Sequence, residues 1–117
     1  MSTLHIGIAG IGILAPGLNG WPAARPLLCT PAAWRRAPTV VPAPSRLPPN
    51  ERRRASVLTK ASIGVADEAL AMAQADAAAL ETVFVSSTSD TANCHALCEA
   101  LAASERIVSP TRFTNSV

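Results

Sequence analysis

Three residues of one short segment, Cys94, His95 and Cys98, have the types and spacing that could bind a metal ion. Two thiols four positions apart on a helix can share a zinc ion, and an imidazole stands next to one of them. On a helix, however, His95 points about 100° away from Cys94 around the axis. The remaining cysteine and histidine, Cys29 and His5, do not supply a second pair. We therefore predict no metal and no cofactor, and expect both thiols to be buried as small apolar side chains.

Cys94 could alternatively serve as a nucleophile, because thiolates are favoured near the start of a helix. A catalytic thiol also needs a base within hydrogen-bond reach, and a cysteine and a histidine adjacent in sequence rarely reach that geometry. Asp90 is the acid that precedes it most closely. We therefore predict that the chain contains no catalytic residue.

A second motif, Gly10-Ile-Gly12-Ile-Leu-Ala15, follows an apolar run and matches the glycine pattern of dinucleotide-binding proteins. That site requires a helix to start at the glycines, so that its amides face the pyrophosphate. Pro16 and the residues after it interrupt such a helix, and the first acid, Glu51, comes too late to bind the ribose. A small nucleotide-binding module therefore remains the weaker alternative. We expect the glycines to permit close packing at the end of a central strand.

Basic residues are concentrated in the first half of the chain. Residues 1–54 hold seven arginines and one acid, whereas residues 55–117 hold three basic residues and seven acids. The basic half could meet a phosphate or an acidic carrier protein. Nucleic acid is disfavoured because lysine clusters and interleaved aromatic residues are missing. Arg52-Arg53-Arg54 is expected as a solvated face at a helix start, where three cations would oppose the helix dipole.

Alternating strands and helices must position these residues. Apolar runs rich in β-branched residues predict strands, and apolar residues at helical spacing predict helices. The pattern favours a layered α/β fold with a short, mostly parallel sheet packed by helices. In chain order we expect a buried strand over 4–14, a helix over about 21–28, a proline-rich surface excursion over 30–50, a helix over about 51–74, a buried strand over 82–87, and a helix capped by Ser89 or Asp90 with a buried stripe of Cys94, Leu97, Cys98, Leu101 and Ala102.

The composition is that of one globular domain. A chain of 117 residues with 49% apolar and 15% charged residues can bury a core, which excludes a disordered chain. Three cysteines, an odd number, argue for a reducing compartment. The apolar run from Ile6 to Leu14 is far shorter than the roughly 20 residues of a membrane-spanning helix. We expect a cytoplasmic protein without a targeting segment, a membrane span or a nucleic-acid partner.

Four segments, taken in order, resemble the N-terminal domain of the β-ketoacyl synthases, a thiolase-like family. They are the glycine-rich run 6–17, the lead into a long helix at 47–54, the strand and helix at 83–87 and 93–101, and the closing run 109–117. Together, in this order, they extend over nearly the whole length of the chain, from residue 6 to residue 117. The resemblance implies a single partial domain over 1–117 with a partial thiolase-like layered fold.

The resemblance also implies a parent activity, the decarboxylative condensation of acyl groups held on an acyl carrier protein. Such domains act in fatty-acid or polyketide (polyene) biosynthesis, usually as dimers, with a cysteine nucleophile assisted by histidines or a lysine. In this family those residues lie beyond the point that matches Val117. The cysteines and histidines of this chain match none of them: Cys29, Cys94, Cys98, His5 and His95.

We therefore expect an N-terminal fragment of a β-ketoacyl synthase-like protein that is inactive alone. A non-catalytic partner subunit of a ketosynthase heterodimer, of the chain-length-factor type, is the alternative. The closing run ends on the apolar Val117 and reads as an element that enters a core, which indicates a domain cut before the catalytic cysteine. Exposed apolar surface should follow, because two strands cannot form a well-covered sheet.

Overall fold

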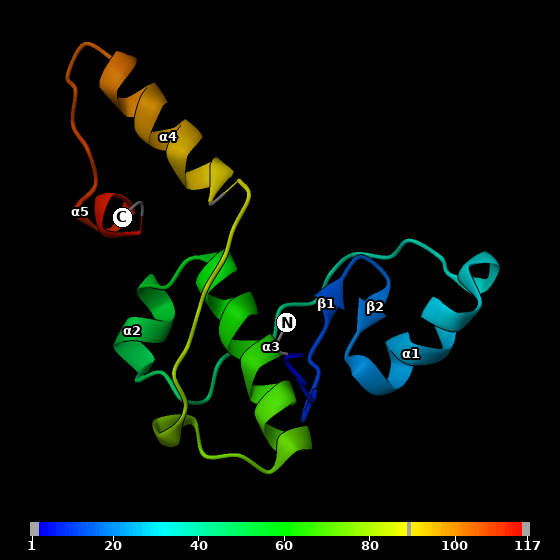
Figure 1. Cartoon of the computed structure of the whole chain (residues 1–117). Coiled ribbons are helices and arrows are strands. Elements are labelled where there is room, and N and C mark those ends of the chain that lie inside the picture. The colour runs from blue at the N-terminus through cyan, green and yellow to red at the C-terminus, as the bar shows by residue number, and fades with distance from the viewer. Residues whose placement is uncertain (1–2, 89, 116–117) are drawn as a thin grey trace.

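The computed structural model describes residues 3–88 and 90–115, and it is mainly helical (Figure 1). A small hairpin comes first, and helices of five to 17 residues follow. In chain order the elements are β1 (Leu14–Ala15), β2 (Leu18–Asn19), α1 (Trp21–Cys29), the 3₁₀ turn η1 (Pro31–Ala33), α2 (Pro49–Arg54), α3 (Val57–Ala73), the 3₁₀ turn η2 (Ala77–Ala79), α4 (Thr91–Ala102) and α5 (Pro110–Thr114).

Helix α3 is the centre of the fold, because every residue from 61 to 70 is at least partly buried. Its start is fixed by Ser56, whose Oγ accepts the backbone N–H of Thr59 at 3.1 Å. Its end is fixed by Gln74, which adopts the left-handed conformation with φ of 52°. The predicted end near Gln74 is confirmed. The two caps fix the ends of α3, and Gly10, Gly12 and Pro42 pack closely against this helix.

The single long helix expected over 51–74 is divided into α2 and α3. Ala55 and Ser56 have extended backbone between the two helices, which frees Ser56 to cap α3. Arg52, Arg53 and Arg54 consequently occupy the last turn of α2, not the first turn of a longer helix. Cations there stabilise the negative end of the helix dipole. The predicted conflict between these arginines and the dipole was therefore wrong.

The mostly parallel sheet is also wrong for the described residues. Their sheet has two strands, β1 and β2, which pair antiparallel with Leu14 opposite Asn19 and Ala15 opposite Leu18. A two-residue turn joins them, and Gly17 in that turn has φ of 77°. Two-residue hairpin turns need such a positive φ, which glycine adopts without strain.

The two expected strands are extended segments without strand pairing. Residues 3–13 lie outside any helix or strand, as do residues 81–86, so the predictions of buried strands over 4–14 and 82–87 were wrong. Val83 and Val85 are 87% and 90% exposed. A strand is stable only when neighbouring strands satisfy its backbone. Neither segment finds such a neighbour among the described residues, although each has the right composition.

Local sequence features of the shorter helices are confirmed. Helix α1 begins at Trp21 with Pro22 in its first turn. Proline is tolerated there because the backbone N–H that it lacks would have no hydrogen-bond partner within the helix. Helix α4 is capped by Asp90, whose Oδ1 accepts the backbone N–H of Asn93 at 3.1 Å. Ser89, the other expected cap, lies outside the described residues, as do Ser116 and Val117 of the closing run. Residues 110–114 of that run form α5.

The proline-rich stretch 30–50 lies on the surface, as predicted, with η1 and the start of α2 as its only helical parts among the described residues. Of its apolar side chains, Val41 and Leu47 are half-buried and Val40 is exposed. Pro44 is buried. The proline-rich stretch therefore packs against the rest of the chain at Val41, Pro44 and Leu47, and it leaves Val40 exposed to solvent.

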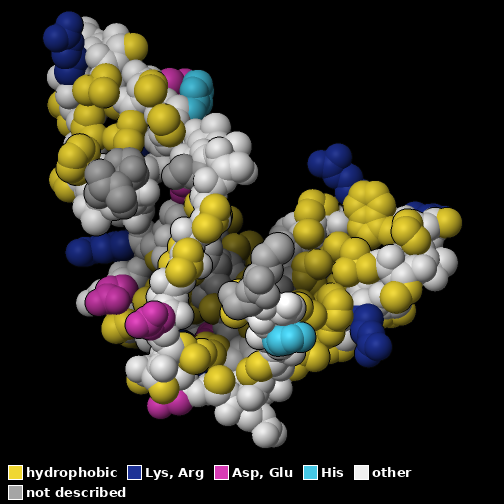
Figure 2. All heavy atoms as spheres, in the orientation of Figure 1, with side chains coloured by type: hydrophobic (Ala, Val, Ile, Leu, Met, Phe, Trp, Pro, Cys, Tyr) yellow, Lys and Arg dark blue, Asp and Glu magenta, His cyan; other side chains and the backbone are white. Residues whose placement is uncertain are grey.

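Very little of the chain is fully buried. In the part that the structure describes, Ala24, Pro44 and Asn93 are the buried residues, and hydrophobic side chains spread over the visible face (Figure 2). The expected apolar exposure is confirmed. None of the helices described is long and apolar enough to span a bilayer.

Candidate functional site

The glycine motif packs against α3 and does not begin a helix. A Cβ added to Gly10 would stand 2.0 Å from the carbonyl oxygen of Ala69, and one added to Gly12 would stand 2.0 Å from that of Val65. Only glycine permits such an approach between two backbones. Close packing at the glycines is therefore confirmed, but it is packing of an extended segment on α3 and not packing at the end of a central strand.

The helix that follows the glycines presents its N-terminus to a carboxylate of the chain itself. Glu68 in α3 accepts the backbone N–H of Trp21 on Oε1 at 2.5 Å and the backbone N–H of Ile13 on Oε2 at 3.0 Å. The amide of Trp21 is the first of those at the start of α1, where an anion would bind. Because a carboxylate of the chain already occupies this end of the helix, and no helix starts at the glycines, the geometry does not fit a dinucleotide site.

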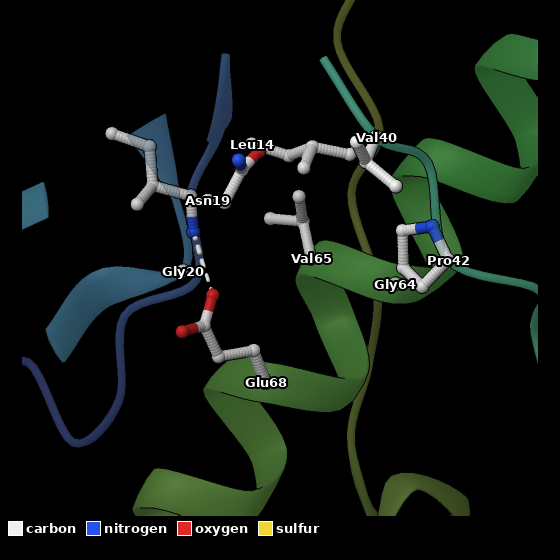
Figure 3. A pocket seen from close by; sticks show the side chains of 9 residues that line it. Leu14, Asn19, Gly20, Val40, Pro42, Gly64, Val65 and Glu68 are labelled. Atoms are coloured by element: carbon white, nitrogen blue, oxygen red, sulfur yellow. Dashed lines mark hydrogen bonds between the residues drawn. The ribbon is translucent and has the colours of Figure 1, made fainter. Parts of the chain in front are cut away.

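A pocket of about 350 Å³ lies beside Glu68, between the hairpin, α3 and the proline-rich stretch (Figure 3). Figure 3 shows Val40 and Pro42 approaching from one side and Leu14 and Asn19 from the other. Gly64 allows this approach, because a Cβ there would lie 2.7 Å from Pro42. The pocket is mainly apolar, and Glu68, its charged group, is already bound to backbone amides. It is suited to apolar contact but offers no pair of groups for acid–base chemistry.

A second pocket, of about 460 Å³, is cationic. Arg52 and Arg53 from α2 and Lys60 from α3 line it together with Val57 and the extended residues 41–43. Arg52 donates from Nη2 to the carbonyl of Leu47 at 3.0 Å, and its Nε is buried without a hydrogen-bond partner. No acid lines this pocket within the described ranges.

Lys60 is the member of this cluster that the sequence interpretation missed. It follows Arg53 by seven residues, which is close to two helical turns and would place both on one face. That spacing was available in the sequence. The structure brings the two cations together across the break between α2 and α3. Three basic side chains and no acid line this pocket in the part of the chain that the structure describes, and we call it the cationic pocket.

The cysteine cluster lies on α4, away from both pockets. Cys94 and Cys98 are exposed, as are Leu101 and Ala102, so the prediction of a buried stripe on this helix was wrong. Helix α4 projects from the body of the molecule and packs chiefly against α5 (Figure 1), which leaves this face of the helix uncovered. His95 lies 3.4 Å from Glu99 of the next turn, measured from Nε2 to Oε1.

The geometry gives no support to the metal and nucleophile interpretations. Among the described residues no group of three or more histidine, cysteine or acidic side chains is arranged to bind a metal ion. His95 pairs with Glu99 and His5 lies in the N-terminal segment, so neither histidine is placed as the base of a thiol. Cys29 ends α1 and is exposed.

Comparison with known proteins gives one family. A family model described as the β-ketoacyl synthase N-terminal domain matches residues 29–117, which is more than half of the chain. The cationic pocket and the cysteine cluster lie within this range, and the glycine motif precedes it. No curated protein and no solved structure matched the chain significantly.

Proposed function

Because the chain belongs to the β-ketoacyl synthase N-terminal domain family, we propose that it is the N-terminal part of a β-ketoacyl-[acyl carrier protein] synthase-like protein. Its role is in acyl-chain elongation, in fatty-acid or polyketide (polyene) biosynthesis. Residues 1–117 are proposed to form a single partial domain that does not catalyse condensation by itself. The proposed compartment is the cytoplasm.

The placement of the thiols supports the lack of condensing activity. Condensation begins when a thiolate accepts an acyl group, and that thiolate needs a partner that activates it. Cys29, Cys94 and Cys98 are all exposed, and the imidazole adjacent to Cys94 pairs with Glu99. Cys94 is the thiol with a histidine beside it in the sequence, and that histidine is not placed to act as its base.

The cationic pocket supports an acyl carrier protein as the partner, since carriers of this kind are acidic. Arg53 and Lys60 come from different helices and present positive charge on one surface. Opposite charge on two proteins accelerates their encounter and fixes their orientation. The carrier would thus dock on the α2–α3 face while it delivers its acyl group to a catalytic partner.

Acyl transfer in a single turnover tests this function. The purified chain is mixed with an acyl carrier protein that bears an acyl thioester, and its intact mass is followed with time. We expect no acyl adduct. A stoichiometric adduct that disappears in one of the variants Cys29→Ser, Cys94→Ser or Cys98→Ser would show that the chain contains its own nucleophile.

A non-catalytic partner subunit of a ketosynthase heterodimer is the second candidate. It is favoured by the exposed apolar residues Val83, Phe84 and Val85, which a second subunit could cover. Co-expression with a ketosynthase subunit distinguishes the two candidates. A stable complex of the two chains supports the subunit role, and separate elution of the chain removes it.

A further inference from the structure

One serine of the chain, Ser56, follows a run of arginines. The run Arg52-Arg53-Arg54 ends two residues before it, and the apolar Val57 comes directly after it. Of the serines and threonines in the chain, Ser56 alone has arginine at both the second and the third position before it. Protein kinases discriminate among substrates partly by such charge patterns. A kinase whose substrate groove carries acidic side chains would therefore select this hydroxyl.

The backbone at Ser56 is extended, which is the form in which a kinase binds the residues around its acceptor. Ala55 has φ of −60° and ψ of 138°, and Ser56 has φ of −66° and ψ of 165°, at the break between α2 and α3 (Figure 1). Ser56 is half-buried, and the side chains of Arg53, Arg54 and Val57 are exposed. The charge pattern and a non-helical backbone thus coincide at one hydroxyl.

The arginines before Ser56 can also become extended when α2 opens. This helix has six residues, whereas an isolated helix needs about 12–15 residues to be stable in water. Five of the six residues are exposed, and Arg52 is half-buried. Local opening of such a segment costs little free energy compared with opening of the packed helix α3.

We propose that Ser56 is a phosphorylation site for a protein kinase that selects arginine before its acceptor serine. The Oγ of Ser56 attacks the γ-phosphorus of a nucleoside triphosphate, so that an Oγ–P ester bond forms. The bond between the γ-phosphorus and the oxygen that bridges to the β-phosphate breaks. The hydroxyl proton passes to the carboxylate base of the kinase, and the nucleoside diphosphate leaves.

The chain places favourable partners around a phosphate on Ser56. The Oγ of Ser56 already accepts the backbone N–H of Thr59 in the first turn of α3, where the helix dipole stabilises negative charge. The three basic residues of the cationic pocket lie within four positions of Ser56 along the chain. A phosphate carries a charge of about −1.5 to −2 at neutral pH. It would therefore offset most of the positive charge of this pocket.

Phosphorylation of Ser56 would also regulate the surface on which the carrier is proposed to dock. With the positive charge of the cationic pocket reduced, an acidic carrier should bind more weakly. This consequence rests on the function proposed above, whereas the modification of Ser56 does not.

Phosphorylation of the purified, folded chain by the catalytic subunit of the cyclic AMP-dependent protein kinase, with ATP and Mg²⁺, tests the site. Intact mass counts the phosphates, and peptide fragmentation locates them. We expect one phosphate per chain, on Ser56. Ser56→Asn should accept none, and it keeps α3 intact because asparagine also caps helices. Ser62→Ala, which removes a hydroxyl within α3, is the matched control and should be modified as the wild type is.

The basic residues have separate effects in this experiment. Arg53→Ala should lower the initial rate of phosphorylation severalfold, whereas Arg25→Ala, on exposed surface of α1, should not change it. The phosphorylated chain should melt at a higher temperature, because the phosphate stabilises the start of α3. Lys60→Ala should reduce that rise, and Arg25→Ala should preserve it. An unchanged melting temperature would contradict the contact between the phosphate and the cationic pocket.

Three results would overturn the proposal. The first is a chain that takes up no phosphate on Ser56 while the same kinase modifies a reference peptide. The second is faster modification of another residue, such as Thr39, which follows Arg35 and Arg36. The third is modification of Ser56 only after denaturation, which would mean that the folded chain hides the hydroxyl. A carrier that binds neither form of the chain argues against the proposed docking and leaves the modification of Ser56 standing.

Discussion

The carboxylate of Glu68, near the middle of α3, accepts the backbone N–H of Trp21 at the first turn of α1, with 2.5 Å between the two atoms. The same carboxylate accepts the N–H of Ile13 beside the hairpin. One acid thus joins three segments and supplies the negative charge that the start of α1 favours. Figure 3 shows Glu68 reaching from α3 toward the hairpin strand.

Replacing Glu68 should detach α1 and the hairpin from α3. Glu68→Ala removes both acceptors, and we expect it to lower the free energy of unfolding by about 2 kcal/mol. Glu68→Gln keeps one acceptor oxygen and loses the charge, so a loss of about 1 kcal/mol is expected. Urea denaturation measures both values. Glu105→Ala, at an exposed position in a turn, is the control and should change stability by less than about 0.5 kcal/mol.

The role of Glu68 illustrates what the sequence could not predict. Its two donors are 55 and 47 residues away along the chain, and nothing in the local pattern of an amphipathic helix distinguishes it from Asp67. Asp67 instead pairs with Arg46 of the proline-rich stretch. Both relationships depend on how distant segments pack, which residue periodicity does not encode.

Helix ends, by contrast, were predictable because their causes are local. Asp90 caps α4 by accepting a hydrogen bond from the backbone N–H of Asn93, only three residues further along the chain. Pro22 likewise lies in the first turn of the helix that it favours, α1. Strands were not predictable in this way. Residues 82–85 have strand composition, but a strand also needs a partner, and the described chain supplies none for them.

The glycines of the first motif should differ sharply in their tolerance of substitution. Gly10→Ala and Gly12→Ala place a Cβ 2.0 Å from a backbone oxygen of α3, so the segment must move away from the helix. We expect each variant to lose about 2 kcal/mol or more of stability. Thermal and urea unfolding provide the measurement.

Gly7→Ala is the matched control, because its added Cβ meets nothing within 4 Å. It should be neutral or stabilise the chain by up to about 1 kcal/mol, through the reduced entropy of the unfolded state. Equal destabilisation by Gly7→Ala and Gly10→Ala would contradict the packing of this segment on α3.

The exposure of the thiols predicts rapid chemical labelling. Cys29, Cys94 and Cys98 are exposed, so a thiol reagent should modify all three in the native chain at rates close to those of the unfolded chain. Circular dichroism should be unchanged by the labelling. If Cys94 or Cys98 reacts only after denaturant is added, the stripe on α4 is buried in solution, as the sequence pattern indicated.

The cationic pocket predicts how binding of an acyl carrier protein depends on charge and salt. Arg53→Ala and Lys60→Ala should each weaken binding severalfold in isothermal titration calorimetry, mainly at low ionic strength, where charges on a surface are least screened. Arg106→Ala is the control, since Arg106 lies outside this pocket. A carrier that binds all three variants with equal affinity docks elsewhere.

Asn93 predicts a stability effect at the junction of α4 and α5. It is 8% exposed, and its Nδ2 donates to the carbonyl of Arg112 at 2.8 Å. Asn93→Asp keeps the shape but replaces the donor with oxygen, so a carboxylate would face that carbonyl. We expect a loss of about 2 kcal/mol or more, because the carbonyl of Arg112 loses its donor and a charge is placed at the nearly buried position 93.

Hydrogen–deuterium exchange should locate the effect of Asn93→Asp. Amides of α5 should exchange faster, while those of α3 keep their wild-type rates, because Asn93 contacts α5 and not the centre of the fold. Asn93→Ala should give a smaller loss of stability, since it removes the donor without adding charge. His95→Ala, two residues further along α4 and exposed, should leave α5 protected. Unchanged exchange of α5 in Asn93→Asp would mean that this hydrogen bond does not hold α5 in place.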